Sequence, residues 1–403
     1  MNIKHLLQKN LNRTNQDFLK VLASISNTNK FSIFLVGGAV RDSILNIKSK
    51  EIDIAISGDI HHFLDVLSPF GIKILQKSQF NTFKVKFKSS IIDISQTRKE
   101  AYLPKGSLPS VKASSIEDDL ARRDFTVNSL AVEINNSNTF LLIDLFNGLN
   151  DIQNKVIKVI HANSFQDDPT RIFRAIRFCN RLSFTLDINT NKLIESNKVY
   201  IKDLSPARHL NEYLKILDES KFIDILNFLN DTEIFHYFLN INVDFNDINF
   251  DQDLTTNFQF LLVAFSKFQA KNQYLDNLSI YPISKKLISF VKDSYCLSDL
   301  MNLLNNNKIS EVDVNLLTYL QNINNLSYKL HKFNNPNDSI NIDKLQNMIF
   351  NSSPLISTDE LLQLGINSGP LMGSLLIDIS LNRFKGIFNT KNEEINFVNK
   401  FIN

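Results

Sequence analysis

The hydrophobic pattern of the chain changes near residue 165, and this change constrains the fold more than any other feature. Before it, short runs rich in β-branched and aromatic residues alternate with Gly and Asn turns, which is typical of a small sheet. The predicted strands cover residues 31–36, 52–56, 82–87, 91–94, 130–134 and 140–145, and short helices cover 39–46 and 61–67. After it, apolar residues recur at helical spacing. The sequence therefore predicts an α+β unit with a small mixed sheet, followed by an all-α remainder.

Composition excludes several classes of protein. The 403 residues, 43% hydrophobic and 21% charged, can form packed units of about 100–200 residues each. No apolar run reaches the ~18 residues of a membrane span, and the first residues are polar without an apolar signal core. We therefore expect a protein of the cytoplasm, or of an organelle matrix, with no membrane partner.

The cysteine and charge content point the same way. Cys179 and Cys296 are the only cysteines, and neither has the spacing of a zinc ligand or a C-x-x-C pair. This indicates a reducing compartment and argues against disulfides and zinc. Lys and Arg number 44 against 42 Asp and Glu, so the net charge is only +2. A surface for nucleic acid would need local clustering of basic residues.

The first motif with chemical content is Gly-Gly at the end of the first predicted strand. Gly37 and Gly38 have no side chains, so their N–H groups can approach an anion at the start of the next helix. Arg41, one turn into that helix, can reach the same anion. A tight turn without a ligand is the alternative, because the motif is neither a dinucleotide-binding turn nor a P-loop.

Three carboxylates follow on two predicted strands. Glu51 and Asp53 are two residues apart, so both side chains point to one face of a strand. Asp93, on another apolar strand, can form the third corner. Crowded carboxylates repel unless a cation lies between them, and Mg²⁺ prefers such hard oxygen ligands. We predict that all three are catalytic and that Glu51 and Asp53 hold magnesium; a solvated strand edge is the alternative.

Two basic segments complete the candidate site. The first consists of Arg122, Arg123 and Asp124. The second is spaced at intervals of three residues and consists of Asp168, Arg171, Arg174 and Arg177. On a helix this spacing forms a slanting stripe, which suits a triphosphate or an RNA backbone. The alternative is a helix capped by Asp168, begun by Pro169 and carrying arginines on a solvated face. That alternative leaves the arginines without acids at the usual helical spacing.

In their order along the chain, these motifs resemble a known family. The sequence reads Gly-Gly-x-Val-Arg-Asp, then paired acids, then Arg-Arg-Asp-Phe-Thr-x-Asn, then Asp-Asp-Pro-x-Arg-x-x-Arg-Ala-x-Arg-Phe. This succession resembles the class II tRNA nucleotidyltransferases, which belong to the poly(A) polymerase group of the polymerase-β-like superfamily. The resemblance covers about residues 31–215, with a fainter match at 364–370. Glu51 departs from it, because the family usually has aspartate there.

The resemblance implies a domain order. An N-terminal helical extension (1–30) precedes a nucleotidyltransferase head (31–150), a neck that recognises the base (151–220), a helical body (221–330) and a tail that binds tRNA (331–403). It also implies roles for the site. Gly38 and Arg41 would hold the triphosphate, and Glu51 and Asp53 the metal ions. Phosphate and ribose contacts would come from Arg122 or Arg123 and from Asp124. The base edge would meet Asp168 and Arg171, and phosphates would meet Arg174 and Arg177.

The activity implied is template-independent, Mg²⁺-dependent addition of CCA to the acceptor end of tRNA from CTP and ATP, with release of pyrophosphate. An enzyme that adds only the terminal A, or a poly(A) polymerase, is the alternative. A different class of alternative, favoured only by Glu51, is a non-catalytic nucleotide- or RNA-binding module.

Two further segments lead to predictions. Residues 97–109 contain Gly and Pro and are predicted to form a mobile, solvent-facing segment, which in the family is associated with addition of the terminal A. Arg208, Glu212 and Lys215 lie at spacings of four and three residues, and we expect ion pairs within one helix there rather than contacts with tRNA.

Overall fold

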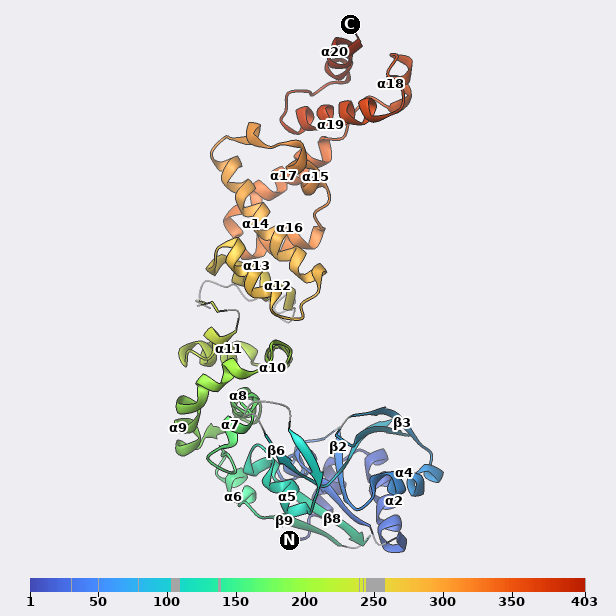
Figure 1. Ribbon diagram of the computed structural model, residues 1–403, viewed down its shortest axis with the longest axis vertical. Helices are drawn as coiled ribbons and strands as arrows, with labels where there is room; N and C mark the ends of the chain where they lie inside the picture. Colours follow the sequence, from blue (N-terminus) through green and yellow to red (C-terminus); the bar gives the residue numbers. More distant parts are fainter. Residues whose placement is uncertain are drawn as a thin grey trace. The chain divides into compact units, whose positions relative to one another are not determined.

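The computed structural model describes residues 1–402 except 30, 50, 79, 103–108, 137–138, 239, 242 and 244–257 (Figure 1). The chain divides into two compact units, Met1–Phe238 and Leu239–Asn403, and each is described by itself. This division does not resolve the five domains expected from the sequence, whose boundaries stay predictions.

The first unit contains a seven-stranded mixed sheet with the order β3-β4-β5-β2-β1-β8-β9. Neighbouring strands are antiparallel except for β2 and β5, which are parallel. The bounds are β1 (Ser32–Val36), β2 (Ile52–Ser57), β3 (Ile72–Lys77), β4 (Thr82–Phe87), β5 (Ser90–Gln96), β8 (Leu130–Asn136) and β9 (Thr139–Asp144). Every predicted strand is present. Of the seven strands of this sheet, only β3 was not predicted, because this edge strand is exposed along almost its whole length and lacks a buried alternation.

Helices cover one face of this sheet. They are α2 (Arg13–Asn29) and α4 (Ile60–Leu67), drawn in blue in Figure 1, with α1 (Lys4–Asn10) at the start of the chain. Phe18 of α2 packs against Phe87 of β4 with ring centroids 5.1 Å apart. Phe63 of α4 meets Phe31 edge to face at 5.2 Å. The side chains of β4 alternate, with Phe83, Val85 and Phe87 buried on this face.

The opposite face is only partly covered. Helix α5 (Ile116–Ala121) packs Leu120 against Phe34 and Val36 of β1, Ala55 of β2 and Ala131 of β8. Helix α3 (Gly38–Ile44) begins directly after β1. A short hairpin of β6 (Arg98–Ala101) and β7 (Ser110–Ala113) follows β5.

The rest of the first unit is mainly helical. Its helices are α6 (Gly148–Gln153), α7 (Ser164–Asp167), α8 (Thr170–Leu182), α9 (Ile188–Asn197), α10 (Pro206–Leu217) and α11 (Phe222–Asp231), and β10 (Val156–Ile157) pairs with β11 (Thr185–Leu186). Helix α8 packs against α10 and α11. It begins at Thr170, one residue after the start at Pro169 that the capped-helix alternative gives, and Asp168 Oδ1 accepts a hydrogen bond from Thr170 N at 3.0 Å.

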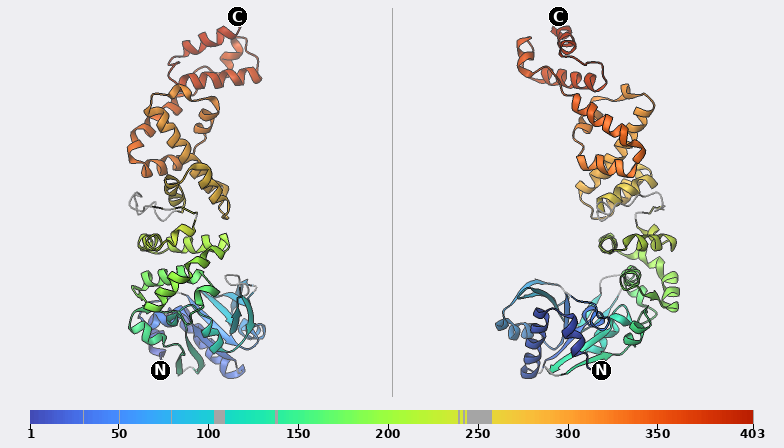
Figure 2. Two further views of the ribbon diagram at one scale, coloured as in Figure 1. Left: turned by 60° about the vertical axis from the view of Figure 1, so that its left-hand side comes forward. Right: turned by 180° about the vertical axis from the view of Figure 1, so that it is seen from behind.

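Every element that the structure describes in the second unit is helical, as the sequence predicts (Figure 2). The α-helices are α12 (Phe258–Phe265), α13 (Lys271–Ser279), α14 (Lys285–Asn305), α15 (Val314–Gln321), α16 (Asn325–Asn334), α17 (Ser339–Asn351), α18 (Thr358–Gln363), α19 (Pro370–Phe384) and α20 (Lys391–Ile402). Among the described helices of both units, none is long and apolar enough to span a bilayer.

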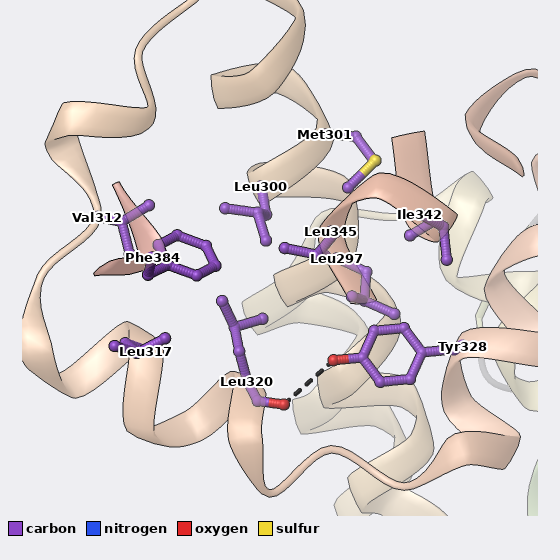
Figure 3. Packing of buried hydrophobic residues seen from close by; sticks show 10 residues of the cluster. All are labelled: Leu297, Leu300, Met301, Val312, Leu317, Leu320, Tyr328, Ile342, Leu345 and Phe384. Atoms are coloured by element: carbon purple, nitrogen blue, oxygen red, sulfur yellow. Dashed lines mark hydrogen bonds between the residues drawn. The ribbon is translucent and has the colours of Figure 1, made fainter. Parts of the chain in front are cut away.

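A single core joins α14 to α17 and the end of α19 (Figure 3). Leu300 and Tyr328 are buried in it, and the Tyr328 hydroxyl donates to the Leu320 carbonyl at 3.1 Å. Ile342, Leu345 and Phe384 belong to the same cluster. This core contains residues from both sides of position 330.

Candidate active site

Many charged side chains of the first unit surround a cavity of about 650 Å³. The predicted site residues that line it are Gly37, Gly38, Arg41, Glu51, Asp53, Arg122, Arg123, Asp124, Asp168, Arg171 and Arg174. Asp93 and Arg177 were also predicted for the site but do not line the cavity. Sequence motifs that are up to 137 positions apart, from Gly37 to Arg174, thus meet around one space.

The Gly-Gly turn needs its glycines for geometric reasons. Gly37 has φ +70°, a conformation that L side chains rarely adopt, and a Cβ atom there would lie 3.0 Å from Arg123 Nη1. The side chain of Arg41 is buried and already engaged. Its Nε and Nη2 donate to Asp42 Oδ1 at 2.8 and 2.7 Å, and its Nη1 donates to Asn128 Oδ1 at 2.5 Å. Contact between Arg41 and an anion stays a prediction.

The carboxylates lie on the open face of the sheet. Asp53 of β2 is in register with Asp93 of β5, and Glu51 lies just before β2. Burial is the main cause that raises the pKa of Asp53, from 3.8 to about 6. Arg123 opposes the rise, and the charges of Asp93 and Glu51 add to it. Asp93 Oδ1 has no hydrogen-bond partner among the described residues, and Lys84 Nζ is 3.5 Å away. Lys84 is therefore the cationic neighbour of this oxygen.

These donors fit a hard divalent cation. Glu51 and Asp53 both line the cavity and offer carboxylate oxygens, the ligands that Mg²⁺ prefers. Across the described ranges, no group of three or more His, Cys, Asp or Glu side chains is arranged to hold a metal. The metal site of Glu51 and Asp53 and the catalytic role of Asp93 stay predictions.

A buried acid that the motifs did not reveal holds the Arg-Arg pair. Asp119 is fully buried and accepts from Arg122 Nη2 at 2.8 Å and from Arg123 Nη2 at 3.0 Å. Burial acts to raise the pKa of Asp119, but Arg123 and Arg122 outweigh it and hold the pKa below its usual value. Glu100 Oε1 also accepts from Arg122 at 3.0 Å. The pair is thus fixed in place at the cavity wall.

Helix α8 contributes a wall of the cavity that bears Arg171, predicted to contact the base, and Arg174, predicted to contact phosphate. Arg171 donates from Nη1 to Ser164 Oγ and from Nη2 to the Arg122 carbonyl, each at 2.7 Å. Arg174 Nε donates to Asp124 Oδ2 at 2.8 Å. Burial acts to raise the pKa of Asp124, but Arg174 lowers it below its usual value. The buried Asp–Arg pair keeps Arg174 charged and oriented.

The acidic partners of Arg174 and Arg177 lie outside their own helix. Arg174 pairs with Asp124, and Arg177 lies within 3.4 Å of Glu212 and 3.2 Å of Glu219. The partners come from other elements, because the fold brings α10 and the segment before β8 against α8. Arg181, one turn beyond Arg177, lines the cavity without having been predicted.

The expected ion pairs within α10 are only partly right. Lys215 Nζ does donate to Glu212 Oε1 at 2.7 Å. Arg208, however, donates from Nη2 to Asp168 Oδ1 at 2.7 Å, across to the residue that precedes α8. All three α10 residues line the cavity. Arg208 therefore positions a predicted base-recognition residue, a role that its local spacing did not reveal.

The described start of the segment at 97–109 forms regular structure, although the sequence predicted a mobile segment. Residues 98–101 form β6, and Arg98 Nη2 lies 2.8 Å from Glu100 Oε1, whose side chain is almost completely buried. Tyr102 donates its hydroxyl to Glu100 Oε2 at 2.6 Å and lies 6.0 Å from the Arg171 guanidinium. Residues 103–108 lie outside the described part of the chain. Other cavity residues that sequence reasoning missed are Asn128, Thr170, Phe178 and Asn211.

Comparison with known families agrees with this geometry. Residues 33–158 match the Poly A polymerase head domain, and residues 183–242 match the family described as the probable RNA and SrmB-binding site of polymerase A. Two segments of the chain thus match models of the poly A polymerase family, in agreement with the resemblance drawn from the motifs.

Two curated relatives give the likeness in more detail. An A-adding tRNA nucleotidyltransferase of Geobacter sulfurreducens is 37% identical over 54% of this chain, and the match covers 25% of that relative. An A-adding tRNA nucleotidyltransferase of Halalkalibacterium halodurans is 25% identical over 100% of this chain and 96% of its own length. The chain thus spans about a quarter of the first relative and nearly all of the second.

Solved structures share the fold over almost the whole chain. A CCA-adding enzyme in apo form is 24% identical with a TM-score of 0.74, covering 99% of this chain and 98% of its own. A Thermotoga maritima CCA-adding enzyme complexed with tRNA is 22% identical with a TM-score of 0.68, covering 100% and 99%. A CCA-adding enzyme complexed with ATP is 23% identical with a TM-score of 0.72, covering 100% of this chain and 99% of its own. A CCA-adding enzyme complexed with CTP is 24% identical with a TM-score of 0.70, covering 99% of this chain and 96% of its own. At these identities the likeness establishes the fold.

Proposed function

We propose that this chain is a template-independent tRNA nucleotidyltransferase that transfers AMP from ATP to the 3′ end of tRNA and releases pyrophosphate. The observation that carries the proposal is one cavity lined both by Glu51 and Asp53 and by Arg171 and Arg174 of α8. Nucleotidyl transfer from a nucleoside triphosphate requires acids and guanidinium groups around one space, because positioning and charge stabilisation supply most of the catalysis.

Glu51 and Asp53 are the residues that would hold Mg²⁺. The raised pKa of Asp53 supports this, because a cation would offset the crowding of Glu51, Asp53 and Asp93. When bound, the ion would neutralise phosphate charge and favour attack by the RNA 3′-hydroxyl on the α-phosphorus. Glu51 retains the charge of the aspartate usual in the family but is one methylene longer.

Asp168 and Arg171 would select the base. Both are held by neighbours: Asp168 by Arg208, and Arg171 by Ser164 and the Arg122 carbonyl. Adenine presents an amino donor beside a ring-nitrogen acceptor, which complements a carboxylate beside a guanidinium. Guanine and uracil present the reverse order, so they would leave polar groups unpaired inside the cavity.

Addition of a single A is our first candidate because the relative that matches along the whole chain is named for that activity. Complete CCA addition, the activity first expected from the sequence, is the second candidate. It is favoured by the fold shared with CCA-adding enzymes solved with ATP and with CTP. Cytosine presents the same donor and acceptor order as adenine, so Asp168 and Arg171 do not distinguish the two.

The test offers three RNAs, a tRNA that ends before CCA, a tRNA that ends in CC and an unrelated RNA, each with labelled ATP or CTP and Mg²⁺. An A-adding enzyme labels only the CC-ended tRNA and only from ATP. A CCA-adding enzyme also incorporates CMP into the shorter tRNA, and a poly(A) polymerase adds many residues to unrelated RNA. No incorporation by folded protein that binds nucleotide would refute the proposal and leave the non-catalytic module.

A further inference from the structure

The sheet face that carries the carboxylates continues past them onto two outer strands. Asp53 is in register with Asp93 on β5, and Asp93 is in register with Lys84 on β4. Cross-strand partners point to the same face of a sheet. Lys84 is therefore on the carboxylate face, and its Nζ lies 3.5 Å from Asp93 Oδ1.

A second row of this face adds two more lysines. Lys86 of β4 is in register with Ile91 of β5 and with Lys73 of β3. Ile91 precedes Asp93 by two residues, so the row lies on the same face. Lys73, Lys84 and Lys86 are all exposed. Among the residues that the structure describes, neither Lys73 nor Lys86 has an acidic partner, and β3 and β4 contain no acid.

This part of the face is open to a partner. Helix α5 packs on this face over β1, β2 and β8, through Leu120 and its neighbours. Arg98 donates to Thr82 at the start of β4, whereas Ile91 of β5, beside Lys86, is exposed. The other face of β4 is closed, because Phe83, Val85 and Phe87 are buried there. The arginine-rich cavity extends from Asp53 toward α8, so the lysines lie on the far side of the carboxylates, across β5.

We propose that Lys73, Lys84 and Lys86, the lysine face, bind backbone phosphates of the RNA acceptor strand whose 3′-hydroxyl reaches Asp53. This inference rests on the proposed function. The nucleoside triphosphate needs the arginine side of the carboxylates, so the RNA must approach from another direction. The lysine face adjoins the carboxylates, because Lys84 is in register with Asp93 on the neighbouring strand. Among the described residues, the ion pair of Lys84 with Asp93 at 3.5 Å is the one that involves these three lysines. Lysines bind phosphate as point charges, without reading base identity.

The test uses the full-length protein with Lys73→Gln and Lys86→Gln combined. The control variant combines Lys20→Gln and Lys77→Gln and loses the same net charge elsewhere. Lys20 lies exposed on α2, and Lys77 on β3 is in register with the buried Phe83 and so points to the other face. Lys84 is left intact because it contacts Asp93. The assay measures AMP transfer to a CC-ended tRNA as a function of salt, together with ATP binding in the absence of RNA.

The lysine-face variant should raise KM for tRNA and leave kcat and ATP affinity unchanged. Loss of two phosphate contacts should also flatten the salt dependence. Between about 50 and about 200 mM salt, KM should rise about tenfold less in this variant than in the wild type or the control. Equal KM and equal salt slopes in all three proteins would overturn the inference, as would a loss confined to kcat. If the wild type transfers no AMP, the proposed function fails instead. In that case a direct tRNA-binding titration of the same variants still decides whether the lysine face binds RNA.

Discussion

Replacing Asp53 by asparagine should stabilise the metal-free protein while abolishing nucleotide transfer. Burial raises the pKa of the Asp53 carboxyl to about 6, with Arg123 opposing this and Asp93 and Glu51 adding to it. The ionised carboxylate therefore costs free energy at neutral pH. Asparagine has nearly the same shape and carries no charge, so it removes this cost together with the predicted metal ligand.

The magnitude follows from the shift in pKa. A rise from 3.8 to about 6 corresponds to at most about 3 kcal/mol. The Asp53 side chain faces the solvent of the cavity, so screening reduces the expected effect to about 1 kcal/mol. The pKa of Asp53 is higher in the folded state than in the unfolded state, so ionised Asp53 destabilises the fold by the full amount above about pH 6. This destabilisation falls to roughly half near pH 5 and disappears below the unfolded-state pKa of 3.8.

The assay is urea unfolding with EDTA at about pH 7.5 and about pH 5. The free energy of unfolding of Asp53→Asn should exceed that of the wild type by about 1 kcal/mol at the higher pH and by less at the lower pH. Added Mg²⁺ should stabilise the wild type but not the variant. Asp65→Asn, at an exposed position on α4, is the control and should change neither. A variant less stable than the wild type at about pH 7.5 would refute the reasoning.

Three other substitutions test separate parts of the molecule. Arg171→Ala should reduce discrimination between ATP and UTP more than it reduces ATP affinity, and an unchanged ratio of kcat/KM values would contradict this base assignment. Gly37→Ala should weaken ATP binding in a titration and cost about 1–2 kcal/mol, because φ is +70° and the added Cβ would lie 3.0 Å from Arg123 Nη1. Glu394→Ala should destabilise the second unit by about 3 kcal/mol in urea, because the fully buried carboxylate accepts from backbone N–H groups and pairs with Arg383 at 2.9 Å. A cost below about 1 kcal/mol would contradict that account.

The sheet could be predicted because its central strands are buried and strongly apolar. In the segment at 52–57, for example, Asp53 is exposed and the other side chains are almost all buried, a pattern that favours a strand. Strand β3 could not be predicted in the same way, because an exposed edge strand has no core-facing pattern. The β6–β7 hairpin was missed for a different reason: its ordering depends on Glu100, which is buried by Arg98 and Arg122.

The cavity could be predicted in outline because short motifs place glycines, acids and arginines next to strand and helix ends. The side chains that orient them could not be predicted. Arg174 pairs with Asp124 across a sequence separation of 50 residues, and Arg208 pairs with Asp168 across a separation of 40. Rules for helical spacing reach only three or four residues along the chain. Such tertiary ion pairs therefore depend on how α8 and α10 pack.

The most direct test of the account is a crystal structure of the protein with Mg²⁺ and a non-hydrolysable ATP analogue. The account predicts the triphosphate between Gly38 and the carboxylates of Glu51 and Asp53, with the adenine edge within hydrogen-bond distance of Asp168 and Arg171. An analogue bound outside this cavity, or one whose adenine ring points away from α8, would contradict it.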